Sequence, residues 1–253
     1  MKIAIIGAGS VGTNLHHGLA LKGIKAELVH ARPLTSAQTP KPDLPQADVY
    51  IYTVVDHVLK EVVDAVYAPK ALHLHTSGSM PMDVFGEDKP HAGVLYFFQS
   101  FSREVLIDDW STIPCFIEGR NIDDVAAIYS LAQMLTGHIY ETTQKDRERL
   151  HIAGIFANNY TNLMYRIAAD VLNGTQIPFE ALLPLIDQTA AKVHSMMPKE
   201  AQTGPAKRAD EAVMAHHQQV LADFRSQNSD FSGEELSELY RALATLIGKG
   251  HSH

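Results

Sequence analysis

The sequence predicts a doubly wound α/β domain with a mostly parallel sheet, followed by an all-helical domain. A glycine-rich turn joins the first apolar run to a helical pattern, strand-like and helical segments alternate up to residue 142, and no convincing strand pattern follows. Alternating strands and helices are typical of a parallel sheet with helices on both faces. We therefore expect one domain over residues 1–142 and a second over residues 143–253.

The opening segment indicates dinucleotide binding. A strand-like run over residues 3–6 leads into a G-x-G-x-x-G turn, and a helical pattern and a second strand-like run over residues 26–30 follow. In such a unit the glycines bring the backbone close to a pyrophosphate, and the helix directs unpaired N–H groups at it. The alternative is a glycine turn that binds nothing. The predicted cofactor-binding residues of this turn are Gly7, Ala8, Gly9, Ser10, Val11 and Gly12.

The end of the second strand favours NADP over NAD. NAD-binding proteins usually place Asp or Glu there to accept the ribose 2′-hydroxyl, but this sequence reads His30-Ala31-Arg32. The planar guanidinium of Arg32 suits a 2′-phosphate, and Thr35 and Ser36 supply hydroxyl donors nearby. A solvated loop arginine is the alternative. A full helix over residues 32–47 is excluded by internal prolines, namely Pro33, Pro40, Pro42 and Pro45.

The next strands are expected over residues 47–55, 71–75, 93–98 and 113–117, with helices over residues 57–66, capped by Asp56, and 122–135. Ligands of open α/β sheets lie beyond the carboxyl ends of the strands. Val54 and Val55 are therefore predicted to contact the cofactor. Ser77 is predicted to hold the nicotinamide or a substrate oxygen, and His75 to bind substrate. An ordinary hydroxyl-rich turn and a core histidine are the alternatives.

After residue 142 we expect only helices. Thr143 and Asp146 resemble a capping box that opens a helix running to Leu172, with Asn173-Gly174 as its stop. Further helices are expected over residues 179–197, 206–225 and 233–247, the last capped by Ser232 and Glu235.

Four polar residues of the long helix, His151, Asn158, Asn162 and Tyr165, are spaced by 7, 4 and 3 and so share one face of an α-helix. Burying such groups without partners costs about 1–3 kcal/mol each. The functional interpretation is that they line a cleft between the domains, with His151 exchanging a proton, Asn158 assisting catalysis and Asn162 binding substrate. The alternative is an interhelical hydrogen-bond network or a dimer seam.

A second helix N-terminus is predicted near residue 204. Thr203 or Gly204 suits the N-cap and Pro205 the first helical position, with Arg208 one turn later. Thr203 and Arg208 are therefore predicted to bind an anionic substrate. A plain capping arrangement without a ligand is the alternative.

The composition limits the kinds of partner. A net charge of −8 argues against nucleic acid and anionic membranes, and no apolar run approaches the ~20 residues that span a bilayer. One cysteine, Cys115, permits no intrachain disulfide, which fits a reducing cytoplasm. The 14 histidines show no metal-ligand spacing, so no metal site is expected.

Several motifs together resemble a group of poorly characterised bacterial NADP oxidoreductase-like proteins. They are the glycine turn, His75-Thr76-Ser77-Gly78, Gln99-Ser100-Phe101, Leu150-His151, Phe156-Ala157-Asn158-Asn159 and Thr203-Gly204-Pro205-Ala206. The group is similar in plan to pyrroline-5-carboxylate reductase and the β-hydroxyacid dehydrogenases. The resemblance implies a Rossmann domain joined to a helical domain of the 6-phosphogluconate-dehydrogenase C-terminal type, which commonly builds a homodimer and closes the active site.

Two departures limit what the resemblance implies. β-Hydroxyacid dehydrogenases carry a catalytic lysine on the first long helix, with asparagine one turn later, whereas this chain has His151 and Asn158 at a different spacing. Some relatives read His-Pro before the glutamine, where this chain reads Tyr96-Phe97-Phe98. The sequence thus predicts an NADP(H)-dependent oxidoreductase for a small carbonyl, hydroxy or imino compound. The alternative is a non-catalytic NADP-binding sensor or scaffold with a helical dimerisation domain.

Overall fold

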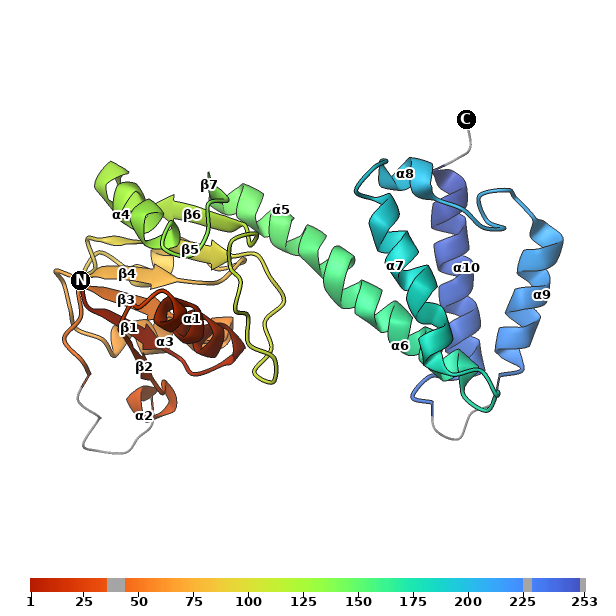
Figure 1. Cartoon of the computed structure of the whole chain (residues 1–253), viewed down its shortest axis with the longest axis horizontal. Coiled ribbons are helices and arrows are strands. Elements are labelled where there is room, and N and C mark those ends of the chain that lie inside the picture. Colours follow the sequence, from red (N-terminus) through yellow and green to blue (C-terminus); the bar gives the residue numbers. More distant parts are fainter. Residues whose placement is uncertain (36–43, 225–228, 251–253) are drawn as a thin grey trace. The chain divides into compact units, whose positions relative to one another are not determined.

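The computed structural model describes residues 1–35, 44–224 and 229–250. The chain forms two compact units, Met1–Asn158 and Asn159–His253, which are described separately (Figure 1). The first contains a seven-stranded sheet with flanking helices, and the second is helical in its described part. The predicted fold class is therefore confirmed. The expected domain bounds, residues 1–142 and 143–253, stay a prediction.

The sheet has the order β2-β1-β3-β4-β5-β6-β7, and all neighbouring strands are parallel except the antiparallel pair of β5 and β6. Because β2 and β3 lie on opposite sides of β1, the chain changes direction across the sheet there, and ligands of such sheets bind at this place. The strands are β1 (Ile3–Ile6), β2 (Ala26–Val29), β3 (Val49–Tyr52), β4 (Leu72–His75), β5 (Ala92–Phe97), β6 (Cys115–Gly119) and β7 (Ile139–Glu141).

The central strands are buried on both faces, so they read as continuous apolar runs. Ile3 and Ile5 of β1 pack in one core cluster with α1 (Ser10–Leu21) and α4 (Ile122–Ala132). Ala4 and Ile6 pack in a second cluster, with α3 (Asp56–Asp64) and the 3₁₀ helix η1 (Met82–Phe85). The sheet thus separates two apolar layers, and its strand ends position the candidate site.

Two local predictions concern the segment that follows β2 and the start of α3. The described part of the segment after β2 contains one short helix, α2 (Arg32–Thr35), and Ser36, Pro40 and Pro42 lie outside the described residues. The expectation that Asp56 caps α3 is wrong. Val55 is the N-cap, without a side-chain hydrogen bond, and Asp56 lies in the first turn, where its charge favours the positive end of the helix.

The long helical run begins as predicted at Thr143, whose Oγ1 accepts a hydrogen bond of 3.3 Å from the N–H of Asp146. It comprises α5 (Gln144–Gly154), a π-helical segment η2 (Ile155–Tyr160) and α6 (Thr161–Leu172). A π-helical turn contains more residues than an α-helical one. The spacing that places His151 and Asn158 on one face of an α-helix therefore does not hold through η2.

The described part of the second unit also contains η3 (Phe179–Leu182), α7 (Leu183–Lys192), α8 (Pro198–Ala201), α9 (Glu211–Ala222) and α10 (Gly233–Lys249). The capping box of Ser232 and Glu235 is confirmed. The predicted helix N-terminus at Thr203–Pro205 is wrong. Residues 205–209 form turns, Ala209 has a left-handed φ of 53°, and Asp210 caps α9 by accepting from the N–H of Val213. Within the described ranges, no helix is both long and apolar enough to cross a membrane.

Candidate functional site

In the turn between β1 and α1, the backbone packs closely against the residue that follows β3 and against the turn itself. Gly7 has a left-handed φ of 121°, which side chains rarely adopt. A Cβ on Gly7 would lie 2.8 Å from the carbonyl oxygen of Thr53, and a Cβ on Gly12 would lie 1.9 Å from that of Gly7. The hydroxyl of Thr53 donates to the Gly7 carbonyl at 2.7 Å. The turn is therefore fixed against β3, and only glycine fits at positions 7 and 12.

Gly9 differs from its two neighbours in this turn. Beyond its chain neighbours, a Cβ there would meet one described atom within 4 Å, the carbonyl oxygen of Thr53 at 3.8 Å. Gly9 is also the N-cap of α1, which has no side-chain cap and no acidic residue in its first turn. The open space at Gly9 and the uncapped N–H groups of Ser10, Val11 and Gly12 together fit a phosphate.

A cleft of about 610 Å³ lies beyond the carboxyl ends of β1, β2 and β3. None of its described lining residues is acidic, and Thr35, His30 and His57 also line it. The lack of a carboxylate at the end of β2 fits a phosphate better than a free ribose hydroxyl. The cleft brings together six of the predicted cofactor-binding residues, namely Gly7, Ala8, Gly9, Arg32, Val54 and Val55.

Arg103 lines the same cleft, although the sequence analysis did not identify it. It lies in the loop between β5 and β6, and its Nη2 donates to the carbonyl oxygen of Ala8 in the glycine turn. The contact spans 95 residues of sequence. No local pattern predicts such a pairing; the only hint was that Arg103 follows the motif Gln99-Ser100-Phe101 closely.

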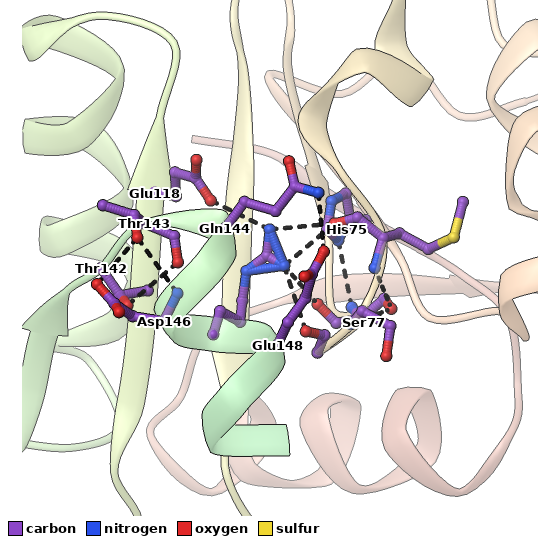
Figure 2. A network of polar contacts seen from close by, with 12 residues as sticks. His75, Ser77, Glu118, Thr142, Thr143, Gln144, Asp146 and Glu148 are labelled. Atoms are coloured by element: carbon purple, nitrogen blue, oxygen red, sulfur yellow. Dashed lines mark hydrogen bonds and ion pairs between the residues drawn. The ribbon is translucent and has the colours of Figure 1, made fainter. Parts of the chain in front are cut away.

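A second polar region, the Arg147 cluster, lies at the ends of β4 and β6 (Figure 2). We use this name for Arg147, Glu118 and the turn of residues 77–80. The buried guanidinium of Arg147 donates to the Met80 carbonyl at 3.0 and 3.1 Å, to Glu118 Oε2 at 3.1 Å and to the Ser77 carbonyl at 3.4 Å. It therefore holds the turn after β4 against the first turns of α5.

Burial acts on both charges of this cluster. It lowers the pKa of Arg147, an effect opposed by the carboxylate of Glu118. It also raises the pKa of Glu118, an effect opposed by the guanidinium of Arg147. Each group thus favours the charged form of the other, as expected for a partly desolvated ion pair.

His75 is fully buried at the end of β4, as expected for a core histidine. Its Nδ1 accepts from the N–H of Ser77 at 3.2 Å, and its ring stacks on Phe85 with a centroid distance of 5.6 Å. Burial, followed by the positive charge of Arg147, lowers the pKa of His75 to about 3, while the Pro81 carbonyl acts in the opposite direction. That carbonyl does not reach hydrogen-bonding geometry, and Nε2 has no partner among the described residues. His75 is therefore neutral near pH 7; its role in substrate binding stays a prediction.

Ser77 organises the turn that follows β4. Its Oγ accepts hydrogen bonds from the N–H groups of Ser79, at 3.1 Å, and Met80, at 3.0 Å. The lone pairs of the hydroxyl are thus used by the turn, and its proton remains for donation. Ser77 can donate to a ligand but cannot readily accept from one.

His151 of α5 lies against this same turn. A Cβ on Gly78 would come within 2.6 Å of His151 Nδ1, and the hydroxyl of Tyr96 lies 2.9 Å from that nitrogen. Burial raises the pKa of Tyr96 to about 12, so its phenol stays neutral. Because Nδ1 bonds to Tyr96, Nε2 is the ring nitrogen left for a ligand. Tyr96 was missed as a site residue, although it lies near the carboxyl end of β5, where such residues gather.

The predicted catalytic and substrate-binding residues that follow α5 are exposed. Asn158 is exposed in η2, at the end of the first unit. Asn162, Thr203 and Arg208 are exposed residues of the second unit, and the last two lack the helix N-terminus on which their prediction depended. Their roles stay predictions.

Two further predictions concern the cysteine and metal binding. Cys115 is fully buried, and burial raises its pKa, which fits an inert core residue. The part of the chain that the structure describes contains no group of three His, Cys, Asp or Glu residues that could hold a metal ion.

Comparison with known families gives one match over more than half of the chain. A domain of unknown function, DUF2520, matches residues 113–247. The chain belongs to this family. A search among proteins of curated function gives no match.

Solved structures share the architecture. A proposed NADP oxidoreductase from Bacteroides fragilis is 35% identical, covers 98% of both chains and has a TM-score of 0.83. A reductive aminase from Aspergillus terreus, solved with NADPH4, cyclohexanone and allyl amine, is 13% identical over 99% of this chain and 96% of its own, with a TM-score of 0.64. A pyrroline carboxylate reductase from Plasmodium falciparum, solved with NADP, is 13% identical over 98% of both chains, with a TM-score of 0.56.

Proposed function

We propose that the protein is an NADP(H)-dependent oxidoreductase that acts on a small carbonyl, hydroxy or imino compound. The observation that carries the proposal is the cleft beside the glycine turn, where the space at Gly9 is open and Arg32 takes the place of an acidic residue. The names of the structural relatives agree with this reading, since the B. fragilis protein is a proposed NADP oxidoreductase.

In this proposal, different residues of the cleft bind different parts of the cofactor. The N–H groups of the glycine turn bind the pyrophosphate, Arg32 with Thr35 binds the 2′-phosphate, and Val54 and Val55 supply apolar contact. When bound, NADPH would supply a hydride in the reducing direction, and NADP⁺ would receive one in the oxidising direction. The protein contributes orientation and the proton.

His151 is the proposed proton donor or acceptor. Tyr96 and Gly78 both lie against the Nδ1 side of its ring, and its Nε2 is left to act on a substrate oxygen or nitrogen. The phenol of Tyr96 accepts when Nδ1 carries a proton and donates when it does not, so it supports either direction of proton transfer. Ser77, through its hydroxyl proton, and Asn158 are proposed to hold the nicotinamide or the substrate.

The second unit is proposed to complete the substrate site and to form a homodimer. Asn162, Thr203 and Arg208 are the proposed substrate-binding residues. Support for dimerisation comes from large apolar side chains of the second unit that are more than half exposed, such as Leu185, Val220 and Leu246. Light scattering of the purified protein tests this: a mass of two chains supports the dimer, and a mass of one chain at micromolar concentration contradicts it.

The catalytic proposal is tested with binding and turnover together. Calorimetry with NADPH should give a tighter Kd than with NADH, and a panel of cyclic imines, ketones and 2-oxo acids should include a compound that oxidises NADPH. His151→Gln should leave the Kd for NADPH near normal and lower turnover ~100-fold. His138→Gln is the matched control, because His138 is exposed and does not line the cleft.

Each result bears on the proposal. Binding of NADPH without turnover across the panel would favour the sensor or scaffold alternative. Normal turnover of the His151→Gln variant would remove His151 from the mechanism. Absence of binding by either coenzyme would overturn the proposed function as a whole.

A further inference from the structure

We propose that Arg103 is a second cationic ligand of the dinucleotide and that it binds the pyrophosphate, whereas Arg32 binds the 2′-phosphate. This inference rests on the proposed function, because it assumes that the cleft holds NADP(H). Its starting point is that two arginines from distant parts of the sequence line one cleft that has no acidic residue among its described lining.

The guanidinium of Arg103 has donors available. An arginine carries five N–H donors, and within the described part of the chain Arg103 uses one of them, on the carbonyl oxygen of Ala8. No ion pair of Arg103 occurs within residues 1–35, 44–224 and 229–250, and its side chain is exposed. Its acidic neighbour Glu104 bonds to the hydroxyl of Ser102 instead. The remaining donors therefore suit a two-pronged contact with phosphate oxygens.

The loop that carries Arg103 is fixed to α1 by a buried asparagine. Asn14 is fully buried, its Nδ2 donates to the Ser102 carbonyl at 2.6 Å, and its Oδ1 accepts from the N–H of Ile107 at 2.9 Å. The same Nδ2 donates to the carbonyl of Ser10, the first residue of α1, at 2.9 Å. Residue 102 and the start of α1 thus share one anchor, which holds Arg103 beside the glycine turn.

Apolar packing supports the same anchor. Trp110, at the far end of the loop, lies so close to α1 that a Cβ on Gly18 would be 2.5 Å from its Nε1. Trp110 also packs edge-on against Phe97, with a centroid distance of 5.0 Å. His17 of α1 bonds to Asp108 of the loop at 2.6 Å. Arg103 is therefore held in place before any ligand binds, which lowers the entropic cost of its contact.

The two arginines sit at different parts of the cleft. Arg103 bonds to Ala8 inside the glycine turn, the part that faces the pyrophosphate in dinucleotide-binding folds. Arg32 follows β2, the part that faces the adenosine ribose. NADPH and NADH share the pyrophosphate, but only NADPH carries the 2′-phosphate. The two assignments therefore predict different coenzyme profiles.

The test is calorimetry of the full-length protein and three variants with NADPH and with NADH. Arg103→Gln should weaken both coenzymes by the same factor, about tenfold or more, since charge-assisted hydrogen bonds are among the strongest. Arg32→Gln should weaken NADPH by about tenfold and leave NADH nearly unchanged. Arg120→Gln, which removes the same charge at an exposed arginine outside the cleft lining, should change neither.

The outcomes separate the inference from the function on which it rests. If the wild-type protein binds neither coenzyme, the proposed function fails and the inference fails with it. If the wild type binds and Arg103→Gln binds both coenzymes with unchanged Kd, the inference alone is overturned. A loss confined to NADPH in Arg103→Gln would assign Arg103 to the 2′-phosphate and would also overturn it. Fluorescence of Trp110 shows whether each variant keeps the fold.

Discussion

The glycine cleft and the Arg147 cluster lie at the same edge of one sheet, yet their polar groups are arranged in opposite ways. In the cleft, donors have no acceptor among the described residues: the first turn of α1 has no side-chain cap, and Arg103 bonds through one donor, to the carbonyl of Ala8. In the Arg147 cluster, both terminal nitrogens of one buried guanidinium donate to backbone carbonyls or to the carboxylate of Glu118, although its Nε has no partner among the described residues. The first region is arranged for a ligand, and in the second the guanidinium of Arg147 holds the fold together.

This difference leads to a general expectation. Substitutions at Gly9, Arg32 and Arg103 should change coenzyme affinity with little effect on stability, and substitution of Arg147 should do the reverse. The protein offers a convenient probe, because its one tryptophan, Trp110, is buried in the first unit and reports the unfolding of that unit.

The largest effect is expected for Arg147→Leu. Removing the guanidinium leaves the carbonyl of Met80 and the partly buried carboxylate of Glu118 without their partner. Breaking a buried pair in this way typically costs about 3–5 kcal/mol, so the free energy of unfolding should fall by that amount. Urea unfolding followed by Trp110 fluorescence measures it.

The control is Arg149→Leu, the same change on the same helix at an exposed position. It should have little effect on unfolding. An equal loss in both variants would mean that the contacts of the buried Arg147 guanidinium are not the source of the stability.

The second effect concerns the cleft. Gly9→Ala adds a methyl group where the described chain leaves space, and Gly9 has an extended backbone that alanine adopts readily. The Kd for NADPH should rise by about 10- to 100-fold, because the methyl group keeps phosphate oxygens from the N–H groups of the turn. The free energy of unfolding should change by less than about 1 kcal/mol.

Gly137→Ala is the matched control, since a Cβ there meets no described atom within 4 Å beyond its chain neighbours and Gly137 lies outside the cleft lining. Its Kd should equal that of the wild type. A Gly9→Ala variant that binds NADPH normally would show that the space at Gly9 is not occupied by the coenzyme.

The two regions also differ in how far the sequence alone predicts them. The glycine turn is local: Gly7, Gly9 and Gly12 lie within six residues and carry their own signal, and Arg32, Val54 and Val55 follow strand ends that the pattern locates. In the Arg147 cluster, Arg147 bonds to carbonyls of the turn after β4, which lie 67–70 positions earlier in the sequence, and to Glu118, which lies 29 positions earlier. Arg103 meets Ala8 across 95 positions. Such pairings depend on the packing of the sheet and leave no periodic pattern.

Other differences have equally physical reasons. Strand β7, with three residues, is too short to show an alternating pattern. The π-helical segment η2 changes the number of residues per turn, which a pattern analysis at 3.6 residues cannot register. Helix α9 begins at Glu211 and not at Pro205 as predicted, because Asp210 provides a side-chain cap and Ala209 takes a left-handed conformation.

The third effect concerns acid. Burial lowers the pKa of both His75, to about 3, and His73 below their unfolded value of about 6.5. As the pH falls below about 6.5 the unfolded chain takes up protons that the folded chain refuses, so the free energy of unfolding should decrease. For His75 alone the decrease between pH 7 and pH 5.5 should be about 1 kcal/mol, and His73 adds to it in the same direction.

Unfolding in urea at several pH values measures this slope. His75→Leu should make it shallower, because one of the two buried histidines is removed, whereas the exposed His57→Gln should leave it unchanged. An unchanged slope in His75→Leu would mean that His75 is not held neutral by the fold and that water reaches its ring at the end of β4.

The smallest effect concerns the hydrogen bond between Tyr96 and His151, the proposed proton-transfer group. A neutral hydrogen bond contributes about 0.5–1.5 kcal/mol, so Tyr96→Phe, His151→Gln and the double variant should show a coupling free energy of that size in unfolding. A parallel cycle of Tyr96→Phe with His138→Gln should be additive within error, because no hydrogen bond joins Tyr96 to the exposed His138. Coupling in the first cycle alone would mean that Tyr96 holds His151 before substrate binds. Additivity in both cycles would mean that the ring of His151 is not held by Tyr96. His151 would then contribute to ligand binding without contributing to the stability of the fold through this hydrogen bond.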